Sequence, residues 1–165
     1  MSVCYFGGIG VEKDDVKGTT YCKRAAEKGN IKAILQLGIC YMYGKGVVKN
    51  LCTAEKYLRR AIKMGDKQGW EEADEQAVAH RLLAQTCYAH YVRDNLSLNA
   101  FDIVSCIPFI NVTSWRTVSF AIGTGEKAKL KKFLKTEEGK FMLEHLQVAA
   151  DLGDKAAISI LEKCH

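Results

Sequence analysis

Proline is almost missing from the sequence, since Pro108 is the single example among 165 residues. Proline breaks helices and marks turns, so its scarcity favours a helical protein over a turn-rich β-sandwich. The seven cysteines include no pair with the Cys-x-x-Cys spacing of metal and redox motifs. An odd number of unpaired cysteines predicts free thiols, most of them buried on the apolar faces of helices.

Signals for export and membrane insertion are also lacking. The first ten residues, MSVCYFGGIG, contain no basic segment followed by an apolar one, so no secretory signal is predicted and a cytoplasmic location is expected. The apolar segment 103–123 is interrupted by Asn111 and Arg116, which argues against a membrane span. The net charge of +5 is spread along the chain and predicts neither a nucleic-acid nor a membrane partner.

One motif occurs twice, 36 residues apart: CYFGGIGVEKD fills 4–14 and CYMYGKGVVKN fills 40–50. Self-similarity at this period is typical of a stacked array in which one unit cannot bury its apolar face alone. When residues 4–30 are placed on residues 40–66, the identical pairs are Cys4/Cys40, Tyr5/Tyr41, Gly8/Gly44, Gly10/Gly46, Val11/Val47, Lys13/Lys49, Tyr21/Tyr57, Arg24/Arg60, Ala25/Ala61 and Gly29/Gly65.

Each unit has the pattern of a helical hairpin. Asn30 is a suitable N-cap, and apolar residues at helical spacing predict a first helix through Tyr43. The following Gly-Lys-Gly step gives the backbone the freedom to reverse, and Val47 is placed to fill the space between the helices. A second helix is expected from about residue 51 to residue 64, ended by Gly65.

The order of these features resembles the Sel-1-like repeat family, relatives of the tetratricopeptide repeat. The resemblance covers one full unit at 31–66 and the rear half of another at 4–30. It implies an all-α fold, a short right-handed α/α superhelix (solenoid) of antiparallel helical hairpins, in which the two helices cross most closely at Gly38. The residues that carry the motif are Ala33, Leu37, Gly38, Tyr41, Gly44, Gly46 and Val47, followed by Ala54, Ala61 and Gly65.

The remaining chain departs from this pattern, although we expect one domain over 1–165. A first helix is predicted at 73–92, and the end of the sequence, LQVAADLGDKAAISILEKC, restates residues 23–40. A divergent, enlarged third repeat is therefore expected at 67–153, with a closing helix at 154–165. Within it, the apolar segment 99–125 has no clear period, and either an atypical hairpin helix or a functional loop across the array fits.

No motif for catalysis, cofactor or metal is found. The string GTGEKAKLKKF at 123–133 lacks the Lys-Ser/Thr ending of a phosphate loop. His80 and His90 lack the i, i+4 spacing of a helical metal pair. Cys40, Cys52 and Cys87 fall on apolar helix faces, where thiols are poor nucleophiles. The lysines of 127–135 fit a solvated helix face better than a phosphate or acidic lipid site. The sequence therefore predicts a protein that is not an enzyme.

The resemblance implies a protein–protein interaction module, either a general adaptor or scaffold in signalling or secretion, or a small bacterial immunity protein that sequesters a toxin or effector. We favour the single-partner binder because the array is short. Exported, cysteine-rich relatives proposed to act enzymatically on the cell wall are the alternative from another class. For each residue an ordinary edge-of-core contact is the competing interpretation. The partner is expected on the concave surface, at Lys32, Gln36, Ile39, Tyr43, Ala79, Leu83, Thr86, His90 and Trp115.

Overall fold

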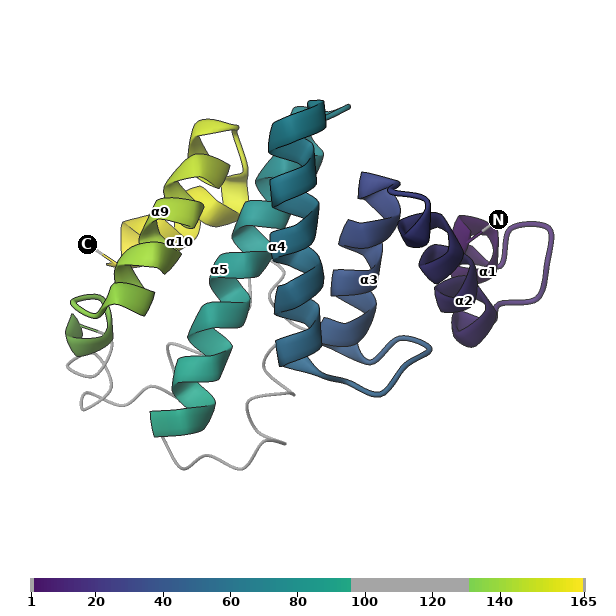
Figure 1. Ribbon diagram of the computed structural model, residues 1–165. Coiled ribbons are helices and arrows are strands. Elements are labelled where there is room, and N and C mark those ends of the chain that lie inside the picture. Colours follow the sequence, from purple (N-terminus) through teal and green to yellow (C-terminus); the bar gives the residue numbers. More distant parts are fainter. Residues whose placement is uncertain (1, 96–130, 165) are drawn as a thin grey trace. The chain divides into compact units, whose positions relative to one another are not determined.

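The computed structural model describes residues 2–95 and 131–164, and every regular element in these two ranges is a helix (Figure 1). The prediction of an all-α fold is thereby confirmed for this part of the chain. The chain divides into two compact units, residues 1–75 and 76–165. The segment 99–125 and Trp115, for which the sequence left a helix and a loop open, lie outside the described residues.

The first unit consists of α1 (Ser2–Gly7), α2 (Asp15–Glu27), α3 (Ile31–Tyr43) and α4 (Leu51–Gln68). Each helix packs against the next, α1 on α2, α2 on α3 and α3 on α4, as expected for successive hairpins. Capping side chains fix where the three longer helices begin. The caps are Asp14, Asn30 and Asn50, which accept hydrogen bonds from the backbone N–H groups of Lys17 at 2.9 Å, Ala33 at 2.8 Å and Thr53 at 3.0 Å.

The chain reverses in the same way in both hairpins. Gly44 ends α3 with φ 74° and Gly46 follows with φ 64°, left-handed conformations that favour glycine. Gly8 and Gly10 repeat them with φ 66° and φ 70°. A backbone hydrogen bond closes each reversal, from Asn50 N to Tyr41 O at 2.9 Å and from Asp14 N to Tyr5 O at 3.0 Å. The repeated sequence therefore produces a repeated backbone conformation.

The helices of the second hairpin pack tightly at Gly38, where the family resemblance implies their closest crossing. A Cβ atom at this position would lie 2.9 Å from Leu58 Cδ2. In the first hairpin the tight contact involves a different pair of residues. A Cβ on Gly18 would lie 2.8 Å from Phe6 Cε1. The residues 36 positions later are Met42 and Ala54. The first hairpin thus combines a larger residue on one helix with a smaller one on the other.

The predicted end of the fourth helix is wrong. Gly65 does not end the helix; α4 continues to Gln68, and Gly69, with φ 85°, is the residue after it. Gly65 is buried, and a Cβ there would overlap the indole ring of Trp70. A glycine is needed at this position because only its small size leaves room for the Trp70 ring. In the sequence such a glycine cannot be told from one that ends a helix.

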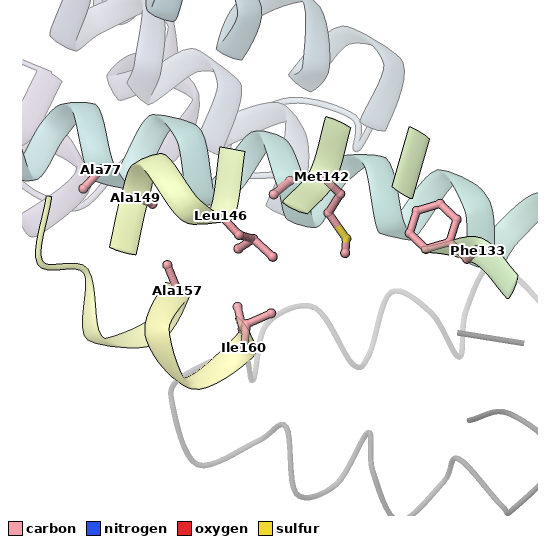
Figure 2. Packing of buried hydrophobic residues seen from close by; sticks show 8 residues of the cluster. Ala77, Phe133, Met142, Leu146, Ala149, Ala157 and Ile160 are labelled. Atoms are coloured by element: carbon pink, nitrogen blue, oxygen red, sulfur yellow. The ribbon is translucent and has the colours of Figure 1, made fainter. Parts of the chain in front are cut away.

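The second unit contains α9 (Glu137–Asp151), α10 (Lys155–Cys164) and most of α5 (Ala73–Asn95), which begins in the last residues of the first unit. Helices α9 and α10 pack on each other around a cluster of buried apolar side chains. Figure 2 shows Leu146 of α9 beside Ala157 and Ile160 of α10. The buried members of the cluster are Ala77, Ala84, Phe133, Met142, Leu146, Ala149, Ala157 and Ile160.

The turn between α9 and α10 repeats the turn between α2 and α3, as the sequence similarity of the chain's end predicted. Gly153 and Gly29 have φ 88° and 83°. Backbone hydrogen bonds follow the same pattern, from Asp154 N to the carbonyl of residue 149 at 3.0 Å and from Asn30 N to the carbonyl of residue 25 at 3.2 Å. Asp154 caps α10 through the N–H groups of residues 156 and 157, as Asn30 caps α3.

Candidate protein-binding surface

One side of α3 keeps its side chains only partly buried. Lys32, Gln36, Ile39 and Tyr43 follow each other at helical spacing, so they form a single row, which we call the α3 row, and all four are half-buried. Most of the other side chains of α3 are buried, with Ile31 and Tyr41 as the exceptions, so the α3 row is the largest partly exposed set of side chains on this helix. The buried residues of the helix are Ala33, Ile34, Leu35, Leu37, Gly38, Cys40 and Met42.

The α3 row begins at a cluster of opposite charges. The Lys32 ammonium lies 3.0 Å from Glu71, 3.3 Å from Glu72 and 3.1 Å from Glu75. Hydrogen bonds that the Lys32 ammonium donates to Glu71 and Glu75 raise the pKa of Lys32 above its ordinary value, so this lysine is charged throughout the physiological range. Because 41% of the Lys32 side chain is exposed, solvent screens its attraction to the three carboxylates. Lys32 therefore has a defined position, and its charge is already balanced by carboxylates.

Two stacked tyrosine pairs were not predicted as part of the surface. Tyr41 stacks on Tyr57 and Tyr5 stacks on Tyr21, one pair in each hairpin, and all four are half-buried. The Lys23 ammonium lies 5.9 Å from the centre of the Tyr41 ring, close enough for a cation–π contact. The sequence carried a signal for these pairs, because both tyrosines recur at the distance of 36 residues.

The predicted set on α5 does not form a comparable row. Ala79, Leu83 and Thr86 are buried, and the Thr86 hydroxyl donates to the Leu82 carbonyl at 2.8 Å. We correct the prediction accordingly: Leu83 and Thr86 do not lie on an accessible surface. The prediction rested on Cys87 and Tyr88, which repeat Cys40 and Tyr41 at an offset of 47 residues, and it transferred the register of α3 to a helix with a different burial pattern. His90 is half-buried.

Two histidines that are far apart in the sequence meet in the second unit. The Nδ1 atoms of His80 and His145 lie 2.6 Å apart, so one ring donates a proton to the lone pair of the other. The edge of Phe141 packs against His145, with ring centres 4.3 Å apart. The sequence offered no spacing signal for this pair, because 65 residues separate them. Across the described residues, no three His, Cys, Asp or Glu side chains are grouped so that they could hold a metal ion.

The described cysteines are free thiols with different surroundings. Cys22 and Cys40 are buried, and burial raises the pKa of both thiols, so they are poor nucleophiles at neutral pH. The Thr19 hydroxyl lies 3.7 Å from Cys40 Sγ. Cys52 is exposed, which corrects its placement on an apolar face. Cys4, Cys87 and Cys164 are half-buried.

The helices in the described ranges are all too short or too polar to cross a membrane.

Consecutive hairpins with the same caps, reversals and tyrosine pairs define a protein of the helical-hairpin repeat class. The family model described as the Sel1 repeat matches residues 1–30 and 31–66, one match for each of the two hairpins of the first unit. Sel1 repeat proteins are generally protein-interaction modules and typically have no catalytic role. No curated protein matches the chain.

The solved structures that are similar to the chain include two whose descriptions name this repeat or fold. One is a Sel1 repeat protein from Oxalobacter formigenes, with 20% identity and a TM-score of 0.37, covering 95% of this chain and 72% of that one. The other is c5321, a protective antigen of uropathogenic Escherichia coli strains with an SLR fold, at 18% identity and a TM-score of 0.37. The similarity to c5321 covers 94% of this chain and 38% of c5321.

Proposed function

We propose that the chain is a non-enzymatic protein-interaction module that holds one dedicated partner, as an immunity or inhibitor protein holds a toxin or effector. The observation that carries this proposal is the α3 row, a line of half-buried side chains on a helix whose other residues are mostly buried. The partner would lie on the side of the first helices α1 and α3, which the repeat resemblance makes the concave surface. A cytoplasmic location accompanies the proposal.

The chemistry of the α3 row suits a polypeptide partner. Gln36 offers an amide donor and acceptor, Ile39 an apolar surface, and Tyr43 an aromatic ring with a hydroxyl group. Aromatic side chains that are already partly ordered lose little entropy on binding and often contribute most of the affinity. Caps and packed neighbours hold α3 in place, so little reorganisation is needed when the partner binds.

The test is the stoichiometry of the complex captured from the native host. We expect the tagged chain to retain one protein in a one-to-one complex, measured by light scattering after gel filtration. The double variant Ile39→Asp, Tyr43→Ala should weaken the complex at least about tenfold, since two central contacts are lost. The control Val48→Ala, at a residue that is 87% exposed outside the row, should leave the affinity unchanged.

Other results would contradict the proposal. Capture of several proteins, each bound weakly, would favour a general adaptor or scaffold. An affinity that the α3 variant does not change, with its melting temperature preserved, would remove the α3 row as the binding site. The exported, enzymatic alternative requires oxidised cysteines, so seven reactive thiols in the denatured, unreduced protein would count against it.

A further inference from the structure

A row of positive charges follows the outer side of α4. Lys56, Arg60, Lys63 and Lys67 are all exposed and are spaced four, three and four residues apart, so they share one face of the helix. We call these four residues the α4 basic row (α4 is labelled in Figure 1). At 100° per residue the row is opposite the buried side of the helix. The buried side consists of Ala54, Leu58, Ala61 and Gly65.

The acidic residues of α4 do not neutralise the α4 basic row. The helix contains two of them, Glu55 and Asp66. Glu55 accepts from Arg59 Nε at 2.8 Å, and Asp66 accepts from Trp70 Nε1 at 3.3 Å. Arg60 donates to the carbonyl of residue 26 at 3.3 Å. Among the described residues no carboxylate forms an ion pair with Lys56, Lys63 or Lys67, so their charges face solvent.

Comparison of the two repeats shows that hairpin packing does not require these lysines. The residues 36 positions earlier are Thr20, Arg24, Glu27 and Ile31. Only the arginine is shared, although α2 and α4 have the same cap geometry and the same tyrosine stacking. The other three cations are therefore a property of the second repeat alone, on the side of α4 that takes no part in its core.

We propose that the α4 basic row docks an acidic helix of a partner polypeptide, one that carries a carboxylate on each successive turn of one face. Such a helix repeats its charges every 5.4 Å, the interval at which α4 presents its own, so the two rows match in sign and spacing. The row lacks an aromatic side chain on which a nucleobase could stack.

This surface is distinct from the α3 row, and the two proposals can fail separately. The α4 basic row uses none of the residues assigned to the first proposal. Loss of binding in the α3 variant with preserved binding to the acidic helix supports both. A synthetic peptide is the probe, with glutamate at four positions that match the row (i, i+4, i+7, i+11) and alanine and glutamine elsewhere. Its control peptide replaces each of the four glutamates with glutamine.

The experiment is a fluorescence anisotropy titration of the labelled peptide at low ionic strength. We expect the triple variant Lys56→Glu, Lys63→Glu, Lys67→Glu to weaken binding at least about tenfold. The control Lys132→Glu, Lys135→Glu, Lys155→Glu changes the net charge equally at exposed lysines of the second unit and should cost less than about threefold. Salt should weaken wild-type binding, because exposed charges are screened. Circular dichroism checks that each variant is folded.

Several outcomes would overturn the proposal. These are an equal loss in both triple variants, equal affinity for the glutamate and glutamine peptides, or no measurable binding of the glutamate peptide. A single-stranded oligonucleotide or a phosphatidylserine vesicle could also bind more tightly than the peptide. If only the triple variant of the α4 basic row lost that binding, the row would be assigned to that polyanion instead. Should the glutamate variant unfold, Lys56→Gln, Lys63→Gln, Lys67→Gln removes the charge without repulsion, and unchanged peptide affinity in that variant rejects the proposal.

Discussion

The rings of Tyr41 and Tyr57 stack with their centres 5.5 Å apart and their planes 7° from parallel. The pair joins α3 to α4. In the preceding hairpin Tyr5 and Tyr21 join α1 to α2 with a centre distance of 5.4 Å and the same 7°. Two hairpins of different sequence thus fix the pairing of their helices with one side-chain contact, held at the same geometry.

We expect a measurable coupling between Tyr41 and Tyr57. Aromatic pairs contribute about 0.5–1.5 kcal/mol beyond the area they bury. A double-mutant cycle with Tyr41→Leu and Tyr57→Leu, followed by urea unfolding, should give a coupling energy in that range. The control cycle combines Tyr41→Leu with Val48→Ala, and its two effects should add. Additive effects in the tyrosine cycle would show that the stacking makes no contribution of its own.

Gly46 should be less tolerant of substitution than Gly10, its counterpart in the first repeat. Both have positive φ, and alanine in that conformation costs roughly 1 kcal/mol or more at either position. A Cβ on Gly46 would in addition overlap the Asp15 carbonyl of α2, whereas a Cβ on Gly10 has no atom within 4 Å. Gly46→Ala should therefore reduce the free energy of unfolding by about 1–3 kcal/mol more than Gly10→Ala.

The free energies of unfolding of the two alanine variants, from chemical denaturation, check this expectation. Equal losses would mean that the contact between the reversal and α2 adjusts without cost.

Asp154 should make the second unit sensitive to acid. Burial raises the pKa of this carboxyl, but the hydrogen bond from Arg81 at 2.8 Å and the N–H groups that it caps outweigh burial, so the pKa is lowered. A lowered folded-state pKa contributes stability above the ordinary value of about 4 and loses it as the pH falls below that value. Asp154→Asn keeps a capping side chain, as Asn30 does in α3, but removes the charge.

We expect Asp154→Asn to lower the free energy of unfolding by about 1–3 kcal/mol at pH 7, with a smaller difference from wild type below pH 4 or so. Denaturation curves across this pH range measure it. Asp151→Asn, at an exposed carboxylate of α9, is the control and should have little effect. A difference that does not change with pH would exclude the charge of Asp154 as the cause.

Thiol reactivity should follow burial in the native protein. Among the described cysteines Cys52 alone is exposed, and it should react before the other five with iodoacetamide at pH 8. Cys22 and Cys40 are buried with raised pKa values, so they should react only as the first unit unfolds. Mass spectrometry of timed digests identifies the order of labelling among these six cysteines. Early labelling of Cys40 would contradict the packing of α3 against α2.

The hairpins of the first unit were predictable because their signals are local. The Asn30 cap, the apolar spacing of α3 and the Gly44–Gly46 reversal each depend on neighbours within a few residues. Gly65 was misread because the ring that requires it, Trp70, belongs to the tertiary packing. A helix-ending glycine and a glycine that admits a ring look the same in a sequence.

The candidate site was less predictable than the fold. Helical spacing alone predicts the α3 row. It does not predict that the charge of Lys32 is balanced, because Glu71, Glu72 and Glu75 reach this lysine from about 40 residues further along the chain. The positions of Leu83 and Thr86 were inferred from the Cys-Tyr pair at 87–88, which no Gly-x-Gly reversal follows, so no local signal determined which side of α5 is buried. The contact between His80 and His145 also has no local signal.

Compared with Met42 and Ala54 of the next hairpin, Phe6 is larger and Gly18 is smaller, and this difference has an evolutionary consequence. Alanine at position 18 would collide with the Phe6 ring, although the next hairpin has alanine (Ala54) at the position that matches Gly18 and methionine (Met42) at the position that matches Phe6. The effects of mutations at the two positions therefore depend on each other. Alanine at position 18 is accommodated only after Phe6 has been replaced by the smaller methionine. Gene conversion between the two repeats would be tolerated when it copies both codons together and selected against when it copies the second alone.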